Sequence, residues 1–193
     1  MRVLVVYSHP VDTSFNATVH TRIVETLRQR GHAVDDCDLY AENFEARLSR
    51  AERVTYHDIP ANIAPVADYV ERLRAAEALV LCFPVWNYGY PAILKGYFDR
   101  VFLPGVSFTV SGRKVRQNLP HIRRVTAVAT YGGSRLRAML AGDAPRKYVT
   151  RVLRSHVGLT KPVSYVAQYD MNEASREMCE RFLDRVTKAM AAF

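Results

Sequence analysis

Hydrophobic positions along the chain alternate between two periods. Apolar residues recur every four positions at Phe15, Val19, Ile23 and Leu27, which is typical of the buried face of a helix. Similar helical spacing occurs between most of the short apolar segments that have the pattern of β-strands. These segments are residues 3–7, 34–39, 78–83, 125–131 and 163–169. Strands that alternate with helices predict an α/β fold, in which helices cover a parallel sheet.

One smaller feature interrupts this alternation. Residues 108–115, with Ser111 and Gly112 at their centre, predict a short hairpin before the fourth strand. No linker or low-complexity run divides the 193 residues, so we expect a single domain over residues 1–193. The first strand is interrupted at Ser8 and does not continue as a secretory signal, and no apolar stretch approaches membrane-spanning length. We therefore expect a cytoplasmic protein.

The third apolar segment ends in a loop that is rich in aromatic residues. Residues 78–83 are continuously apolar, as in a strand buried on both faces, and Pro84 is expected to end it because proline cannot donate to a sheet. Trp86, Asn87 and Tyr88 follow directly. Open α/β sheets bind ligands at the carboxyl ends of their strands, so this loop predicts a site for a planar aromatic cofactor.

Two other loops follow predicted strands and are expected at the same edge of the sheet. The first, residues 8–16, places His9, Ser14 and Asn16 at a helix amino terminus, which favours an anion. Simple capping by Thr13 or Ser14 is the better explanation if this loop is considered alone. The second, residues 130–134, contains Gly132 and Gly133, and glycine lets the backbone approach a ligand closely. Taken together, the three loops fit the phosphate and the ring of a flavin mononucleotide.

The positive charge of the chain is concentrated in one segment. Between Arg113 and Arg154 there are eleven basic residues and one acid, Asp143, whereas the remainder has sixteen basic and eighteen acidic residues. Such a segment attracts phosphates, nucleic acid or a membrane surface, although a merely solvated basic face is an equal alternative. No nucleic-acid-binding fingerprint accompanies the charge, so we expect no nucleic-acid partner.

Other catalytic classes lack their motifs. There is no G-x-G-x-x-G after the first strand and no P-loop, which argues against a dinucleotide Rossmann site and a P-loop NTPase. Leu136 stands where a nucleophile elbow needs glycine. The histidines are scattered, and the three cysteines lie far apart without C-x-x-C, so we expect neither a metal site nor disulfides.

Several motifs together carry a resemblance to a known family. They are Ser8-His9-Pro10, Thr13-Ser14-Phe15-Asn16, Asp38-Leu39-Tyr40, the run from Pro84 to Arg100, and Thr130-Tyr131-Gly132-Gly133-Ser134. The chain resembles the flavodoxin-like NAD(P)H:quinone oxidoreductases, a group that includes the DT-diaphorase type, azoreductases and modulators of drug activity. The resemblance implies a flavodoxin-like three-layer sandwich with a five-stranded parallel sheet of order 2-1-3-4-5. It also implies a bound FMN, with FAD as the alternative, and a homodimer with active sites at the subunit interface.

The same resemblance implies roles for individual residues. The flavin phosphate would be held by His9, Ser14, Phe15 and Asn16. The isoalloxazine would be lined by Pro84, Val85, Trp86, Asn87 and Tyr88. Its pyrimidine side would contact Thr130, Tyr131, Gly132 and Gly133.

The implied reaction is a two-electron, ping-pong hydride transfer from NAD(P)H through flavin to quinones, or to azo or nitro compounds. Animal members of the family have a tyrosine and a histidine after the double glycine, but residues 135–143 contain neither, which leaves Tyr131 as the candidate catalytic proton donor. Arg135 and Arg137 are candidates for pairing with phosphates of NADPH or FAD. The alternative function is a regulatory flavoprotein that docks on a membrane transporter, such as a potassium efflux system. A one-electron carrier fits poorly, because such flavodoxins are acidic and this sequence has a pI near 9.6.

Overall fold

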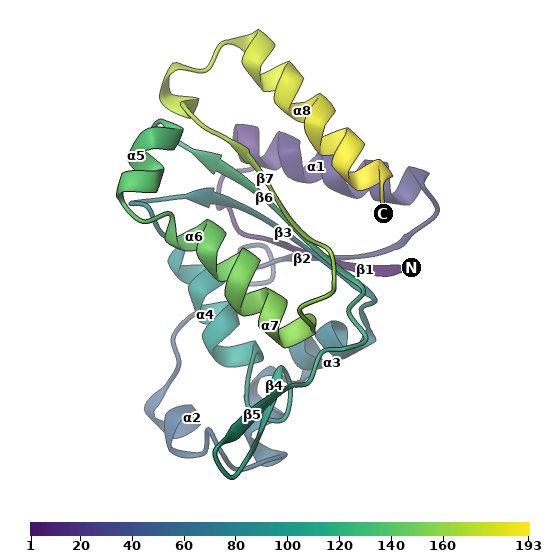
Figure 1. Cartoon of the computed structure of the whole chain (residues 1–193), viewed down its shortest axis with the longest axis vertical. Coiled ribbons are helices and arrows are strands. Elements are labelled where there is room, and N and C mark those ends of the chain that lie inside the picture. The colour runs from purple at the N-terminus through teal and green to yellow at the C-terminus, as the bar shows by residue number, and fades with distance from the viewer.

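The computed structural model describes residues 1–193 and has a five-stranded parallel sheet at its centre (Figure 1). The order of its strands is β2-β1-β3-β6-β7, which is 2-1-3-4-5 when only these five strands are numbered. The predicted fold class and strand order are therefore confirmed. The strands are β1 (Arg2–Tyr7), β2 (Ala33–Asp38), β3 (Ala78–Val85), β6 (Arg124–Tyr131) and β7 (Val163–Gln168).

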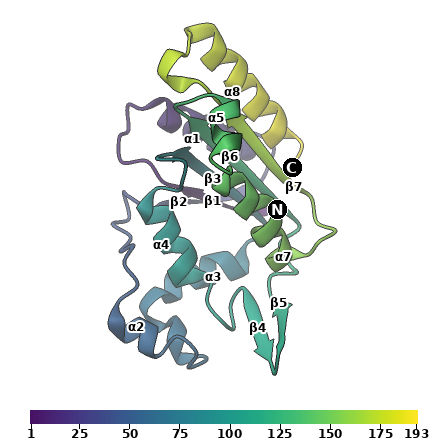
Figure 2. The same cartoon turned by 60° about the vertical axis from the view of Figure 1, so that its left-hand side comes forward.

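Helices cover both faces of the sheet, as the alternating pattern predicts (Figures 1 and 2). On one face, α1 (Phe15–Gln29) and α8 (Arg176–Ala191) bury Ile23 and Phe182 against the strands. On the other face, the larger core includes Leu73, Tyr97 and Leu153. The elements of that face are α3 (Ala67–Ala75), α4 (Ala92–Val101), α6 (Ala144–Lys147), a π-helical turn (Tyr148–Leu153) and α7 (Arg154–Val157).

Short elements fill the connections between these layers. The predicted hairpin is present as β4 (Phe108–Ser111) paired antiparallel with β5 (Lys114–Gln117), and it projects from one end of the molecule (Figure 2). The sequence pattern does not predict the elements between β2 and α3. These are α2 (Arg50–Val54) and a 3-10 helix (Ala61–Val66). The remaining elements, α5 (Arg135–Leu140) and a 3-10 turn (Met171–Glu173), lie in loops after β6 and β7.

The prediction that Pro84 ends the third strand is wrong, because β3 continues to Val85. Ser8 N–H donates to the Cys82 carbonyl, so the backbone polar groups of Cys82 point toward β1. The backbone nitrogen of Pro84, two residues later, points to the same side. The pairing between β1 and β3 ends at Tyr7 and Cys82, whereas Pro84 and Val85 stay in register with Thr130 and Tyr131 of β6. The missing N–H of proline therefore points where no partner strand remains.

Three further features of the structure correspond to the membrane, metal and disulfide expectations above. No helix combines the length and the apolarity that a membrane crossing requires. His, Cys, Asp and Glu side chains form no group of three or more that could hold a metal ion. Cys37 and Cys82 are buried free thiols, and Cys179 is a half-buried one.

Candidate functional site

The three loops singled out in the sequence meet at the carboxyl edge of the sheet. Asn16 Nδ2 donates to Thr130 Oγ1 at 3.1 Å, which links the first loop to the end of β6. The rings of His9 and Trp86 lie edge to face with centroids 5.6 Å apart. The Tyr88 hydroxyl lies 3.8 Å from the position that a Cβ on Gly133 would take, so the aromatic loop also reaches the glycine turn.

Two buried hydroxyl groups at the carboxyl end of β1 have no hydrogen-bond partner. Ser8 is fully buried and its Oγ is unpaired, and so is the hydroxyl of Tyr7. Burial raises the pKa of Tyr7 to about 12, so this hydroxyl stays protonated and able to donate. An unsatisfied buried polar group costs about 1–3 kcal/mol, and a ligand that accepts hydrogen bonds would remove that cost.

The first loop also shows the capping that was the alternative explanation. Ser14 Oγ accepts a hydrogen bond from Ala17 N–H at 3.1 Å, as a helix N-cap does. His9 Nδ1 accepts from Val11 N–H, and burial lowers the pKa of this histidine. Phe15 packs on Phe182 of α8, with ring centroids 6.1 Å apart. Capping therefore accounts for Ser14, whereas it does not account for the unpaired hydroxyls of Tyr7 and Ser8.

The aromatic loop is a tight turn in an unusual backbone conformation. Asn87 and Tyr88 have φ of 49° and 57°, and the N–H groups of Trp86 and Gly89 donate to each other's carbonyls, the pattern of a type I′ turn. A residue with a Cβ costs roughly 1–2 kcal/mol in this left-handed region, somewhat less for asparagine. Trp86 and Tyr88 are each 42% exposed, whereas Pro84 and Val85 are buried in β3. The turn thus holds two aromatic rings at the open edge of the sheet.

The glycine turn leaves a small polar hollow of about 250 Å³. A Cβ on Gly132 would lie 3.0 Å from Asn172 Oδ1, and one on Gly133 would lie 3.9 Å from Arg137 Cδ. The N–H groups of Asp170 and Asn172 donate to the carbonyls of Gly133 and Gly132. The loop after β7 therefore braces the turn, and the Asn172 side chain lies close against Gly132.

Tyr131 extends from the end of β6 into a buried polar network. Its hydroxyl donates to Asp143 Oδ1 at 2.7 Å and also contacts the Tyr165 hydroxyl at 2.7 Å. Arg146 completes the network by donating to Asp143 Oδ2 at 3.0 Å and to the Tyr169 hydroxyl at 2.8 Å. Tyr131 is only 3% exposed, and burial raises its pKa well above its ordinary value. A phenol held in this way exchanges a proton poorly, so its position favours a structural support for the adjoining turn.

Sequence reasoning missed several residues of this site. Tyr7 and Ser8 are extreme cases, because only the packing reveals that their hydroxyls have no partner. A signal for Asp143 did exist, since it is the single acid in the basic segment and a lone acid among arginines favours an ion pair. Asn172 follows the fifth strand, so the rule that loops at carboxyl ends meet at one edge would also have selected it.

The chain is similar to several known proteins. A family model described as flavodoxin-like fold matches residues 1–190. Among curated relatives, rat NAD(P)H dehydrogenase [quinone] 1 is 30% identical over 150 residues, which are 69% of this chain and 54% of that protein. The uncharacterized NAD(P)H oxidoreductase YcaK of Escherichia coli is 30% identical over 135 residues, 69% of this chain and 66% of that protein. The chain spans about half the length of the animal relatives that it matches.

Solved structures resemble the whole chain. The NAD(P)H:quinone oxidoreductase of Methanothermobacter marburgensis is 25% identical, with a TM-score of 0.83 over 99% of this chain and 98% of that chain. An FMN-dependent NADH-azoreductase of Bacillus anthracis, solved with FMN, is 15% identical with a TM-score of 0.80, over 99% and 98% of the two chains, a likeness of fold alone. Together with the family model, which covers all but the last three residues, these matches show that the chain belongs to the flavodoxin-like fold family.

Proposed function

We propose that this protein is a flavin-dependent NAD(P)H:quinone oxidoreductase that binds FMN and reduces quinones, or azo or nitro compounds, by two electrons. The observation that carries the proposal is the meeting of three chemically different loops at one edge of the sheet. They offer unpaired buried hydroxyls, exposed aromatic rings and a glycine turn. The names of the rat relative and of the Methanothermobacter structure support the same reaction class. Homodimer assembly and a cytoplasmic location stay predictions.

The residues at this edge fit FMN chemically. Ser8, Ser14 and Asn16, together with the amino terminus of α1, would bind the phosphate, and the unpaired Ser8 and Tyr7 hydroxyls would gain an acceptor there. Trp86 and Tyr88 would contact the ring. Backbone N–H groups of Gly132 and Gly133 would favour negative charge on its pyrimidine side. The bound flavin would supply the hydride chemistry, which it accepts from NAD(P)H and passes to the acceptor.

In this proposal Tyr131 acts as a positioning residue. Its hydroxyl is held by Asp143 and Tyr165, so the end of β6 and the glycine turn that follows cannot shift easily. A catalytic proton donor, the role that the sequence suggests for Tyr131, would instead have to face the open edge of the sheet. Tyr88 offers an exposed phenol there.

The experiment that tests this function uses the purified protein and its visible spectrum. We expect a yellow protein, or a colourless one that turns yellow with FMN. Its colour should bleach when NADH or NADPH is added without oxygen and should return when a benzoquinone follows. A protein that binds neither FMN nor FAD would overturn the proposal.

Gly133 offers a sharper test of where the flavin lies. A Cβ here meets nothing closer than 3.8 Å, so Gly133→Leu should fold normally while its side chain fills the space between Tyr88 and Arg137. We expect the dissociation constant for FMN, measured by quenching of flavin fluorescence, to rise at least about tenfold, or about 1.4 kcal/mol. Gly133→Ala is the matched control, with little change expected. Equal FMN affinity in the leucine variant and the wild type would contradict the assignment.

A further inference from the structure

One strongly basic surface lies away from the three loops described above, at the end of the molecule formed by α2 and the β4–β5 hairpin. Both elements stand at the same end in Figures 1 and 2. Six exposed cations belong to this surface, which we call the basic end. They are Arg47, Arg50, Arg53, Arg113, Lys114 and Arg116. None of them takes part in a salt bridge.

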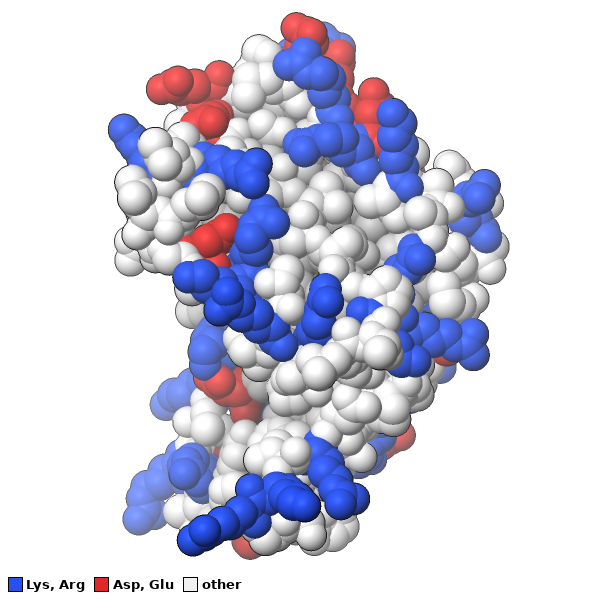
Figure 3. Space-filling model, in the orientation of Figure 1, with Lys and Arg blue, Asp and Glu red and all other residues white.

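Few acids oppose these cations. The unpaired exposed acids in or beside the same segments are Glu45, Asp58 and Asp68. Glu52 of α2 is instead held inside by the buried Arg100, at 2.7 Å. The hairpin has no acid, and none occurs between Asp99, which pairs with Lys95, and Asp143. Figure 3 shows Lys and Arg side chains gathered over this end of the molecule. With six cations against three acids, the basic end attracts a negative partner.

The hairpin also carries apolar side chains beyond the core. Val110 lies opposite Val115 in the register, so the two share one face, and they are 54% and 68% exposed. Phe108 lies on the same face nearer the base, where its ring packs on His156 with centroids 6.1 Å apart. The apolar face of the hairpin therefore begins on the core and ends in solvent.

The cations of the hairpin lie beside this apolar face. Lys114 pairs with Ser111 and Arg116 pairs with Thr109, so both lie on the opposite face, while Arg113 stands at the turn. An isolated two-stranded hairpin is only marginally stable in water, and both of its outer edges are unpaired here. Such an element fits a partner that is negative at its surface and apolar beneath.

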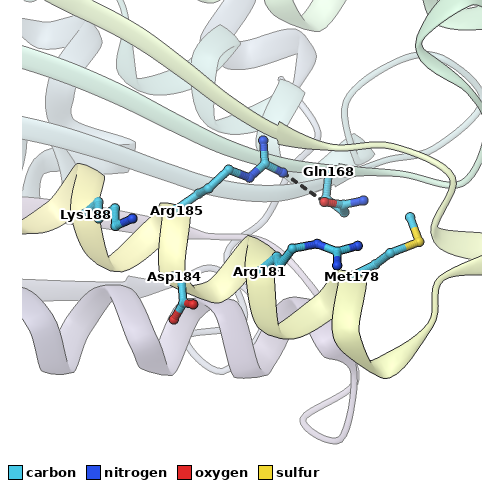
Figure 4. A pocket seen from close by; sticks show the side chains of 6 residues that line it. All are labelled: Gln168, Met178, Arg181, Asp184, Arg185 and Lys188. Carbon is cyan, nitrogen blue, oxygen red and sulfur yellow. Dashed lines mark hydrogen bonds between the residues drawn. The ribbon is translucent and has the colours of Figure 1, made fainter.

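The cations of α8 are different, because acids and internal contacts use them. The helix has four basic and three acidic residues. Arg181 pairs with Glu177. Figure 4 shows Arg185 reaching Gln168 of β7, to which it donates at 2.9 Å, and Asp184 on the same stretch of the helix. Of these two cationic regions, the basic end is the one with a clear surplus.

Charge and shape select the occupant of this surface. Two copies that met through their basic ends in a two-fold contact would bring like charges together. The hairpin is narrow and projects from the molecule, so it offers no broad flat face to a folded partner (Figure 2). A bilayer that contains anionic lipids yields to a narrow hairpin, and it offers negative headgroups above an apolar interior.

We propose that the basic end docks on an anionic lipid bilayer, with its cations among the headgroups and with Val110 and Val115 inserted between them. This docking does not depend on a bound flavin. If the proposed function is correct, docking brings the enzyme to the place where quinones with apolar tails dissolve.

The test is co-sedimentation of the purified protein with vesicles of phosphatidylcholine, with or without one quarter phosphatidylglycerol. We expect binding only to the anionic vesicles, and weaker binding as salt is raised. Arg113→Gln/Lys114→Gln should lower the partition coefficient at least about tenfold, because each cation near an anionic surface contributes about fivefold. Val110→Thr/Val115→Thr keeps residues that favour a strand and should lower it about threefold.

The matched control is Arg28→Gln/Arg30→Gln. It removes the same charge from exposed positions at the end of α1 and should leave vesicle binding nearly unchanged, because these side chains lie away from the basic end. All the changed side chains are exposed, so circular dichroism should show the same thermal unfolding for each variant and the wild type.

The remaining outcomes would overturn the docking surface. Equal binding to neutral and anionic vesicles would do so, and so would no binding or an equal loss in the α1 control. If the protein binds no vesicle and the valine variant converts a dimer into a monomer in analytical ultracentrifugation, the hairpin contacts a second copy instead. Anionic vesicle binding that the hairpin variants weaken, in a protein that takes up no flavin, would support the docking surface while the proposed function fails.

Discussion

Gly96→Ala is expected to destabilise the protein by about 3 kcal/mol or more, although glycine to alanine in an exposed helix normally stabilises by about 1 kcal/mol. A Cβ on Gly96 would lie 2.2 Å from the Ala46 carbonyl oxygen and 2.5 Å from Ala46 Cα. These are backbone atoms, so no rotamer change relieves the overlap. Urea denaturation measures the effect as a fall in the transition midpoint.

The segment around Ala46 cannot move away easily. Arg100, a buried residue of α4, donates to Glu52 Oε1 at 2.7 Å and also donates to the Glu45 carbonyl. These bonds hold the segment against the helix on which Gly96 lies. Lys95→Ala is the control, since it removes only an exposed pair with Asp99 and should change stability by less than about 1 kcal/mol. An alanine variant as stable as the wild type would show that the close approach does not exist.

Asp143→Ala is expected to cost about 2–4 kcal/mol, because it removes the shared partner of the buried Tyr131 hydroxyl and the half-buried Arg146 guanidinium. Arg146 would lose its ion pair, and the Tyr131 hydroxyl would lose its acceptor. Asp143 also has φ of 43°, a conformation that alanine adopts at a cost of roughly 1–2 kcal/mol. Because the network holds the end of β6, the affinity for FMN should fall together with the stability.

Two variants divide this effect into its parts. Asparagine at position 143 tolerates the left-handed backbone conformation and still offers an acceptor for Tyr131, but it removes the charge. We therefore expect Asp143→Asn to lose less stability than Asp143→Ala. Tyr131→Phe keeps the ion pair with Arg146 and should cost about 1–2 kcal/mol for one buried hydrogen bond. Urea denaturation and flavin-fluorescence titration are the measurements. If the alanine variant loses no more than the phenylalanine variant, the ion pair contributes nothing to the fold.

Much of the fold was predictable from local pattern. The run 78–83 predicts a strand because it is continuously apolar, and the loops after β1, β3 and β6 meet because parallel strands end at the same edge. Ser14 was recognisable as a helix cap from its place before the apolar period of α1. The extent of β3 beyond Pro84 was not predictable, because it depends on where the neighbouring strand β1 ends.

The basic segment shows where sequence reasoning stopped. Its charges do not form one patch, because Arg113, Lys114 and Arg116 lie on the hairpin whereas Arg135 and Arg146 lie beside β7. The second group is completed by Arg181, Arg185 and Lys188 of α8, which lie outside that segment. Counting along the chain therefore located the charge, but its surface distribution depends on how α8 packs beside the sheet.

The amino-acid sequence by itself determined the alternation of strands and helices, the caps, and the three loops that carry the candidate chemistry, because each follows from residues close together in the chain. Only the tertiary structure decided that the hydroxyls of Tyr7 and Ser8 lack partners, that Asp143 joins Tyr131 to Arg146, and that Gly96 must lack a side chain. Each of these depends on atoms brought together from distant segments. Such contacts are set by packing of the whole core, which no local period encodes.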